Sequence, residues 1–105
     1  MVIEYIRYRI SAEQRDPFLN AYLLASKALA ASEYCCGYEL TECEEEPERF
    51  ILRIQWTSTE DHMKKFRASV QFQEFLPHIR PYIGNIEEMQ HYHLTEVRSG
   101  DIERG

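Results

Sequence analysis

Residues 50–62 read FILRIQWTSTEDH and carry the strongest structural signal in the chain. The first seven alternate apolar and polar side chains, which predicts a strand with one apolar face made of Phe50, Leu52, Ile54 and Trp56. Thr57 and Ser58 are each followed three residues later by a carboxylate, a pattern that begins helices. A large aromatic at this strand-to-helix corner is placed to form a pocket wall, so we expect a ligand near Trp56.

Size and composition limit the classes of protein to consider. A length of 105 residues predicts one domain, and 44% hydrophobic with 29% charged residues is typical of a globular chain. The net charge of −6 argues against a nucleic-acid partner. The sequence has no apolar run near the ~20 residues that span a bilayer and no signal-peptide pattern, so we expect no membrane partner and a cytoplasmic location.

The rest of the chain predicts three more strands and two helical regions. The strands are expected over residues 2–10, 34–43 and 86–97, and the helices over 17–31 and 59–67, with a short helix after Ser69. Pro77 and Pro81 are expected to break or turn the chain. This order predicts an α+β, ferredoxin-like split βαβ unit: a four-stranded antiparallel sheet with helices on one face. We assign residues 1–97 to this domain and expect 98–105 to be a flexible tail.

The two faces of the predicted sheet differ in character. On the helix-facing side, the first strand presents Val2, Ile6, Tyr8 and Ile10. The other face is expected to carry a mixture of apolar, aromatic and basic side chains: Ile3, Tyr5, Arg7, Arg9, Ile51, Arg53, Met89, His91 and His93. An apolar patch of this kind usually marks an interface, which predicts a homodimer whose two sheets face each other.

Several segments together resemble a known family. They are VIEYIRYRI at 2–10, ERFILRIQW at 48–56, the spaced residues from Trp56 through His62 and Ser69 to Phe72, and IEEMQHY at 86–92. These are similar to the antibiotic biosynthesis monooxygenase family. The resemblance implies a dimeric α+β barrel with a pocket between sheet and helices in each subunit. Members include oxygenases that oxidise electron-rich aromatics or quinols without metal or flavin, haem-degrading enzymes, and many proteins without a known activity.

The haem-degrading branch fits this chain poorly. Trp56 matches the family's pocket tryptophan, but Ile6 stands where that branch has an asparagine. Leu76 stands where it has a haem-ligating histidine, and the nearest histidine is His78. Isoleucine cannot donate a hydrogen bond and leucine cannot ligate iron, so both departures disfavour haem degradation. A shifted His78 ligand remains an alternative.

Cofactor-free oxygenation needs an apolar pocket and a group that favours the substrate anion. Strand alternation places Tyr8, Trp56 and Tyr92 on the helix-facing side, and we predict these as the catalytic residues. The predicted pocket lining is Ile6, Tyr22, Met63, Phe66, Phe72, Leu76 and His78. Each of these side chains also has a purely structural interpretation as a core residue.

Metal and disulfide chemistry find weaker support. His91 and His93 have a spacing that can chelate a metal, but the sequence indicates no third ligand, and His62 is expected on a helix surface. The three cysteines are odd in number, with two adjacent, which argues against a disulfide framework or a zinc site. The glutamates at 44–48 are typical of a solvated loop. We therefore expect neither a metal nor a cofactor.

The sequence thus predicts a cofactor-independent monooxygenase that oxidises a small aromatic or quinol-like substrate with O2 in a pocket between sheet and helices. The alternative from another class is a non-catalytic dimer that binds a small aromatic ligand. It is motivated by the lack of a nucleophile–histidine–carboxylate set. A haem-binding relative is the third and less favoured interpretation.

Overall fold

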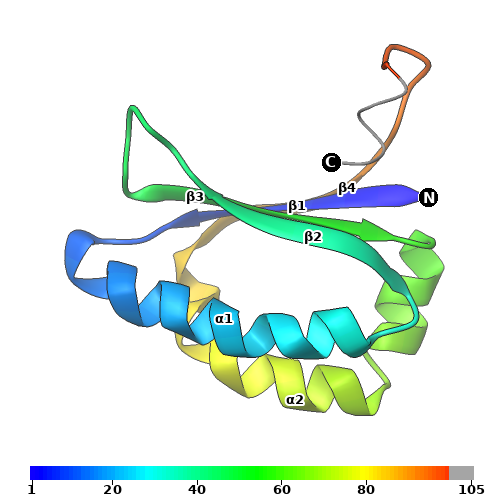
Figure 1. The fold of residues 1–105 in the computed structure, drawn as a ribbon, viewed down its shortest axis with the longest axis horizontal. Coiled ribbons are helices and arrows are strands. Elements are labelled where there is room, and N and C mark those ends of the chain that lie inside the picture. Colours follow the sequence, from blue (N-terminus) through cyan, green and yellow to red (C-terminus); the bar gives the residue numbers. More distant parts are fainter. Residues whose placement is uncertain (100–105) are drawn as a thin grey trace.

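A computed structural model describes residues 1–99, in which four strands form one antiparallel sheet and two helices cover one face of it (Figure 1). The strands are β1 (Val2–Arg9), β2 (Cys35–Glu42), β3 (Arg49–Trp56) and β4 (Ile86–His93). The helices are α1 (Arg15–Ala31) and α2 (Val70–Ile79). The strand order β2-β3-β1-β4 confirms the predicted ferredoxin-like fold. From residue 100 on, the predicted tail lies outside the described residues.

The core forms where the apolar face of the sheet meets α1 and α2. On β1 and β3, residues Ile6 and Leu52 lie opposite each other, as do Tyr8 and Phe50, and all four are buried. Phe18 of α1 packs edge-on against Phe50 and Tyr8. The alternation in residues 50–56 therefore defines the buried face, as predicted. None of the helices within residues 1–99 is long and apolar enough to cross a membrane.

A β-bulge interrupts the pairing of β1 with β4. Arg7 lies opposite Glu88, whereas the next residue, Tyr8, lies opposite Ile86. Glu87 is therefore an extra residue on β4 without a directly opposed partner on β1. Because side chains alternate along a strand, one extra residue exchanges the faces of everything that follows it.

The bulge decides which side chains of β4 point toward the helices. Met89, His91 and His93 lie opposite helix-facing residues of β1, while Tyr92 lies opposite Ile3 on the outer face. The predicted placement of these four β4 residues is therefore wrong. Counting by two from Ile86 without the bulge gives the opposite face for each of them.

The segment between β3 and α2 contains a π-helix, Asp61–Phe66. Its signature is the 3.3 Å hydrogen bond that the Arg67 N–H donates to the carbonyl of His62, which is five residues earlier in the chain. This wider turn directs His62 and Phe66 inward and leaves Met63 exposed. The expectations of a surface His62 and a buried Met63 are both wrong. π-turns inside helices are frequent at functional sites.

The two ends of α2 differ in how well the sequence predicts them. Ser69 caps α2 as predicted, its hydroxyl accepting a 3.3 Å hydrogen bond from the Phe72 N–H. Pro77, expected to break the chain, instead lies within the last turn of α2. Pro81 stands in the first turn of a 3-10 helix, Arg80–Asn85, where a missing N–H is tolerated.

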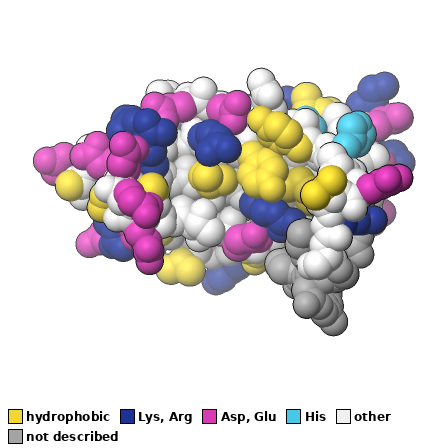
Figure 2. All heavy atoms as spheres, turned by 90° about the horizontal axis from the view of Figure 1, so that it is seen from above, with side chains coloured by type: hydrophobic (Ala, Val, Ile, Leu, Met, Phe, Trp, Pro, Cys, Tyr) yellow, Lys and Arg dark blue, Asp and Glu magenta, His cyan; other side chains and the backbone are white. Residues whose placement is uncertain are grey.

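The outer face of the sheet, seen in Figure 2, gathers hydrophobic side chains near its middle with charged ones around them. Tyr5 and Tyr92 meet edge to face there, with ring centroids 5.3 Å apart. Ile3 is buried beside them. Arg7 of β1 pairs with Glu88 of β4 at 2.8 Å, so cross-strand ion pairs border the apolar centre. The mixed character predicted for β1 and β3 on this face is observed.

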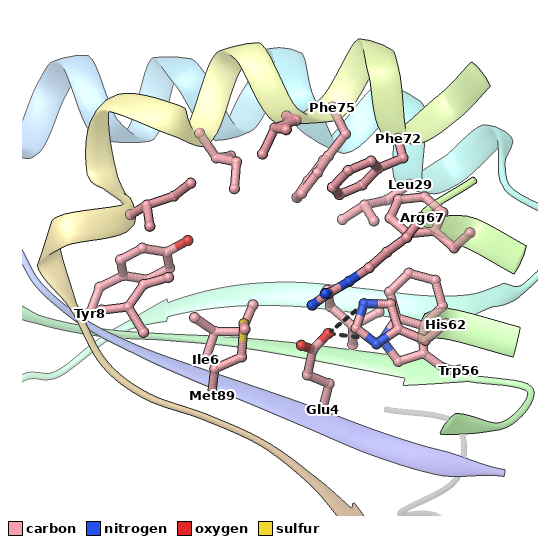
Figure 3. A pocket seen from close by; sticks show the side chains of 16 residues that line it. Glu4, Ile6, Tyr8, Leu29, Trp56, His62, Arg67, Phe72, Phe75 and Met89 are labelled. Carbon is pink, nitrogen blue, oxygen red and sulfur yellow. Dashed lines mark hydrogen bonds and ion pairs between the residues drawn. The ribbon is translucent and has the colours of Figure 1, made fainter. Parts of the chain in front are cut away.

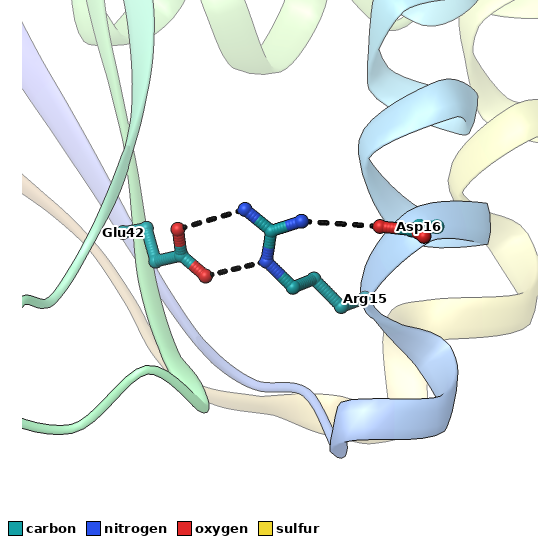
Figure 4. A network of polar contacts seen from close by, with 3 residues as sticks. All are labelled: Arg15, Asp16 and Glu42. Atoms are coloured by element: carbon teal, nitrogen blue, oxygen red, sulfur yellow. Dashed lines mark hydrogen bonds and ion pairs between the residues drawn. The ribbon is translucent and has the colours of Figure 1, made fainter.

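An exposed ion network joins the start of α1 to the end of β2 (Figure 4). The Arg15 guanidinium donates to both carboxylate oxygens of Glu42, at 2.7 and 3.0 Å, and to Asp16 at 3.1 Å. All three side chains remain in contact with water. The network fixes a helix end on the surface and lies away from the core.

Candidate functional site

A cavity of about 240 Å³ lies between the sheet and the helices. Figure 3 shows side chains from β1, β3, β4, α2 and the π-helix pointing into it. Most of its wall is apolar and aromatic, and the polar groups gather at one end, where Glu4, Trp56, His62 and Arg67 meet. A cavity of about 150 Å³ in another protein holds benzene, so this one has room for a substituted aromatic ring.

The cavity opens toward the β4 edge of the sheet. Three of its lining residues, Arg67, Ile83 and Met89, are exposed, whereas Tyr8, Trp56 and the other lining residues on β1 and β3 are buried. A flat apolar ligand can therefore enter between β4 and the helical segment that follows β3. It would then lie with its inner end against the sheet.

Trp56 forms the floor of the polar end. Its indole N–H donates a 2.9 Å hydrogen bond to Oε1 of Glu4, and the side chain is 1% exposed. The His62 ring stacks on the indole with centroids 4.3 Å apart and planes 11° from parallel. The Phe66 ring lies next to both, tilted against the indole with centroids 4.8 Å apart and 6.0 Å from the His62 ring. Because Glu4 takes the N–H, Trp56 offers shape and a stacking surface rather than a free donor.

Three ionisable side chains from distant parts of the sequence converge beside Trp56. Glu4 comes from β1, His62 from the π-helix and His91 from β4. Nδ1 of His62 lies 2.7 Å from Nε2 of His91, and Nε2 of His62 lies 3.7 Å from Oε1 of Glu4. Glu4 is 2% and His62 5% exposed, while His91 is half-buried. We call these three residues the Glu–His–His cluster.

Burial sets the protonation of the cluster. Burial, with smaller effects from His91 and Arg67, lowers the pKa of His62 to about 3. Burial also lowers the pKa of His91, and the Arg67 charge adds to this. Burial raises the pKa of Glu4, opposed by the hydrogen bond from Trp56. Both imidazoles are therefore neutral at pH 7, and each keeps one nitrogen without a proton.

Arg67 is the cation of the site. Its side chain lines the cavity, and Figure 3 shows the guanidinium directed toward Glu4 and His62. Within residues 1–99 the guanidinium has neither a hydrogen-bond nor an ion-pair partner. An unpaired guanidinium at the border of an apolar cavity is suited to bind an anionic oxygen of a ligand.

The opposite end of the cavity is bounded by Tyr8. Its hydroxyl is hydrogen-bonded to that of Tyr22, and both residues are buried. Burial raises the pKa of Tyr8 to about 12. Tyr8 is therefore a neutral phenol at pH 7, with a partner from α1 that holds its orientation.

The predicted site residues divide into two groups. Those that line the cavity are Ile6, Tyr8, Trp56, Phe66, Phe72 and Leu76. Tyr22 lies behind Tyr8 and borders a groove on the other side of α1 instead. Met63 is exposed on the outside of the π-helix.

His78 and Tyr92 also lie away from the cavity. His78 lies beside Ala28 and Ala31 on the surface formed by α1 and α2, and Leu76 takes the inward position. Tyr92 lies on the outer face of the sheet and is 40% exposed. The predictions that these two side chains reach the pocket are wrong. The causes are the helical phase of α2 and the β4 bulge.

Four polar residues of the site were not predicted to lie beside the pocket: Glu4, His62, His91 and Arg67. One signal was available, since Glu4 shares its strand face with Val2, Ile6 and Tyr8, and a charge on an apolar face points to a buried partner. The other three depend on the bulge and the π-helix, which no local pattern indicated.

The family's sequence profile matches residues 1–77, which is more than half of the chain. The chain belongs to the antibiotic biosynthesis monooxygenase family. This confirms the resemblance found in the sequence. The matched region contains β1, α1, β2, β3 with Trp56, and most of α2, and it ends before β4. Membership by itself does not define a substrate.

Individual relatives of this monooxygenase family are distant. The uncharacterized protein YczJ of Bacillus subtilis is 24% identical over 92 residues, covering 88% of this chain and 97% of YczJ. A Bordetella bronchiseptica protein that carries the family name without an established activity has a TM-score of 0.71 at 23% identity, over 90% and 96% of the two chains. A Bacteroides thetaiotaomicron protein of unknown function has a TM-score of 0.73 at 13% identity, over 89% and 96%. These structures support the fold.

Proposed function

We propose that this protein is a cofactor-independent monooxygenase that oxidises a small aromatic or quinol-type compound with O2. The observation that carries the proposal is the cavity itself: an apolar, aromatic-walled space with one polar end that holds a neutral histidine and an unpaired guanidinium. Family membership supports the same reaction class.

Each residue of the cavity has a separate role in the proposed reaction. The substrate reacts as the anion of an acidic hydroxyl or activated C–H group, and water takes the proton, because His62 with a pKa of about 3 is too weak a base. Arg67 stabilises the resulting anion, and Trp56 and Phe66 hold the ring. Tyr8 at the far end fixes how deeply the ring enters. Closing the ring off from bulk water favours electron transfer from the anion to O2 over side reactions.

The substrate supplies all electrons in this reaction. For an anthrone-type substrate, one molecule of oxygen converts the reactive methylene carbon to a carbonyl and releases one molecule of water. A carbon–oxygen double bond forms, two C–H bonds and the O–O bond break, and the second oxygen atom leaves as the water. The carbon loses the four electrons that the two oxygen atoms gain, so no external reductant is needed.

We further propose that the protein acts as a homodimer through the outer face of its sheet. The support is the apolar centre of that face, with Tyr5 and Tyr92 in contact above buried Ile3. Light scattering after size exclusion is expected to give twice the chain mass of 12.5 kDa. Tyr92→Glu is expected to shift the protein to the monomer. A wild-type monomer at micromolar concentration would contradict this part.

Oxygen uptake by chelator-treated protein tests the enzyme proposal. A panel of anthrones and hydroquinones is supplied with O2, and uptake is compared with that of the compounds alone. Arg67→Met is expected to lower kcat/KM about 10- to 100-fold, because it removes the charge that stabilises the substrate anion. Arg15→Met removes an exposed arginine far from the cavity and serves as the matched control, with unchanged kcat/KM.

Two results would contradict the proposal. One is that no compound consumes oxygen faster with protein than without it. The other is an equal loss in Arg67→Met and Arg15→Met, which would indicate a general effect of charge. Ligand binding without oxygen uptake would favour the alternative of a non-catalytic binding protein.

A further inference from the structure

We infer that the Glu–His–His cluster, Glu4, His62 and His91, binds one divalent transition-metal ion per chain. One donor atom from each of the three side chains lies within 4.8 Å of those of the other two. The inference does not rest on the proposed function, because ion binding is measured in the absence of substrate.

The donor set is chemically suited to such an ion. Two imidazole nitrogens and one carboxylate oxygen are the ligands of many three-residue zinc and non-haem iron sites. Such sites leave further coordination positions open, and here those positions would face the cavity. Sites for Ca²⁺ or Mg²⁺ use mainly oxygen ligands, so an imidazole pair selects against them.

The two histidine nitrogens require only a small adjustment, and the carboxylate must also move closer, since the three donor atoms are only within 4.8 Å of one another. Two nitrogens that are each about 2.1 Å from one ion lie about 3.2 Å apart, whereas Nδ1 of His62 and Nε2 of His91 are 2.7 Å apart in a hydrogen bond. A separation of a few tenths of an ångström brings both to coordination distance. His91 is half-buried on an edge strand and has the freedom to move.

Within the described part of the chain, one carboxylate oxygen of Glu4 is free for this role. Both polar contacts of Glu4, from the Trp56 N–H and toward His62, involve Oε1. This leaves Oε2 for an ion, and Figure 3 shows the carboxylate directed toward the cavity. A donor that fixes one carboxylate oxygen while the other binds the ion is the usual support of a metal ligand.

The placement of the cluster is costly for folding. Glu4 and His62 are almost completely buried, and a buried carboxylate beside two imidazoles is expensive to desolvate. Two local irregularities, the β4 bulge and the π-helix, bring His91 and His62 to Glu4. Irregularities of both kinds are common at functional sites.

Arg67 opposes the ion and offers a further test. Its charge acts on all three members of the cluster. A cation bound there is repelled by the guanidinium, so Arg67→Met is expected to tighten ion binding several-fold. An ion bound elsewhere on the protein would be insensitive to this change.

The ion and the oxygenation proposed above exclude each other. An ion bound to the cluster fills the polar end of the cavity, where the proposed reaction places the substrate anion beside Arg67. Protein loaded with Zn²⁺ is therefore expected to lose oxygenase activity and to regain it with a chelator.

Titration of chelator-treated protein with Co²⁺ tests the inference directly. We expect visible absorption bands of Co²⁺ bound to nitrogen and oxygen, saturating at one ion per chain, and competition by Zn²⁺. His62→Gln and His91→Gln are expected to raise the dissociation constant more than about 100-fold. His78→Gln and His93→Gln are the matched controls and should bind as the wild type does.

Circular dichroism checks that each variant folds. Of the cluster variants, His91→Gln is expected to disturb folding least, because His91 is half-buried on an edge strand. Absence of bound Co²⁺ up to millimolar concentration would overturn the inference. Equal binding by wild type and His91→Gln would also overturn it, as would loss of binding in His93→Gln, which would indicate a surface His91–His93 chelate. None of these results bears on oxygen uptake by the metal-free protein.

Discussion

Two groups of ionisable residues differ in how they stabilise this molecule. The exposed network of Arg15, Asp16 and Glu42 has short, well-directed hydrogen bonds of 2.7 to 3.1 Å (Figure 4). The Glu–His–His cluster includes a contact as long as 3.7 Å and is nearly dry. Judged by distance alone, the surface network is the better set of interactions.

Burial reverses the order of the two groups when they are ranked by their expected effect on stability. Water screens the surface network, so both its formation and its loss have small effects. In the buried cluster, each group has exchanged hydration for one or two protein partners, and removing a partner leaves a polar group unsatisfied. The effect of a polar residue on stability therefore depends on how deeply it is buried, and its effect on function depends on whether it reaches the cavity. Short distances do not identify the residues with large effects.

The largest effect is expected from removing the indole on which His62 stacks. Trp56→Ala is expected to lower the free energy of unfolding by about 3–5 kcal/mol, because it deletes a buried indole and leaves Glu4 without its donor. Urea denaturation measures the change. Trp56→Phe keeps most of the volume and is expected to lose less. A loss below about 1 kcal/mol for the alanine variant would show that the site collapses without cost.

The next test uses pH. The pKa of His62 is about 3 in the folded protein against an ordinary 6.5, so the unfolded chain binds more protons between these values. Stability from this group is present above pH 6.5 and is lost as pH falls toward 3. Between pH 7 and pH 4.5 chelator-treated wild type should lose about 2 kcal/mol more than His62→Gln.

The difference between the two proteins isolates His62. Protonation of Glu4, whose pKa is raised, acts in the opposite direction, and it is present in both. His91 and Arg67 also face His62 and stay unchanged. Parallel stability curves for wild type and His62→Gln would contradict a buried, neutral His62.

A smaller effect is expected at the far end of the cavity. Tyr8→Phe leaves the buried Tyr22 hydroxyl without its partner, which is expected to lower the free energy of unfolding by about 1–2 kcal/mol. Replacing both tyrosines by phenylalanine should recover part of this loss. A double variant that loses the sum of the two single effects would show that the hydroxyls act independently.

The smallest effect should come from the surface network. Arg15→Met is expected to lower the midpoint of thermal unfolding by no more than about 3 °C, and the difference should shrink in 1 M NaCl, where charges are screened within about 3 Å. Differential scanning calorimetry at two salt concentrations measures it. A salt-independent loss of stability as large as that of Trp56→Ala would show that the exposed network contributes as much to stability as the buried site.

The sequence was sufficient for the regular parts of the structure. The alternation in residues 50–56, the helical stripe after Pro17 and the cap at Ser69 correctly predicted β3, α1 and the start of α2. Each rests on interactions between residues close in the chain, where spacing alone defines which side chains share a face. Spacing also indicated six of the predicted site residues that line the cavity: Trp56 and Tyr8, predicted as catalytic, and Ile6, Phe66, Phe72 and Leu76, predicted as lining.

The polar end of the cavity depended on events that local spacing does not encode. The extra residue Glu87 turns His91 inward and Tyr92 outward, and its effect exists only against β1, about 80 residues earlier. The π-turn places His62 rather than Met63 against the sheet, where its imidazole stacks on the Trp56 indole. A carboxyl group on a buried face needs a hydrogen-bond partner, and Glu4 has one because the Trp56 indole N–H donates to it.

By itself, then, the amino-acid order determined the strands, the helices, their succession and the position of the tryptophan corner, since periodicity and capping act within a few residues. Tertiary structure alone decided that Glu4, His62 and His91 meet. Their convergence depends on the register between strands, on the extra residue Glu87 in β4 and on the π-turn between β3 and α2. In β4, that one residue exchanges the inner and outer faces of the side chains that follow it.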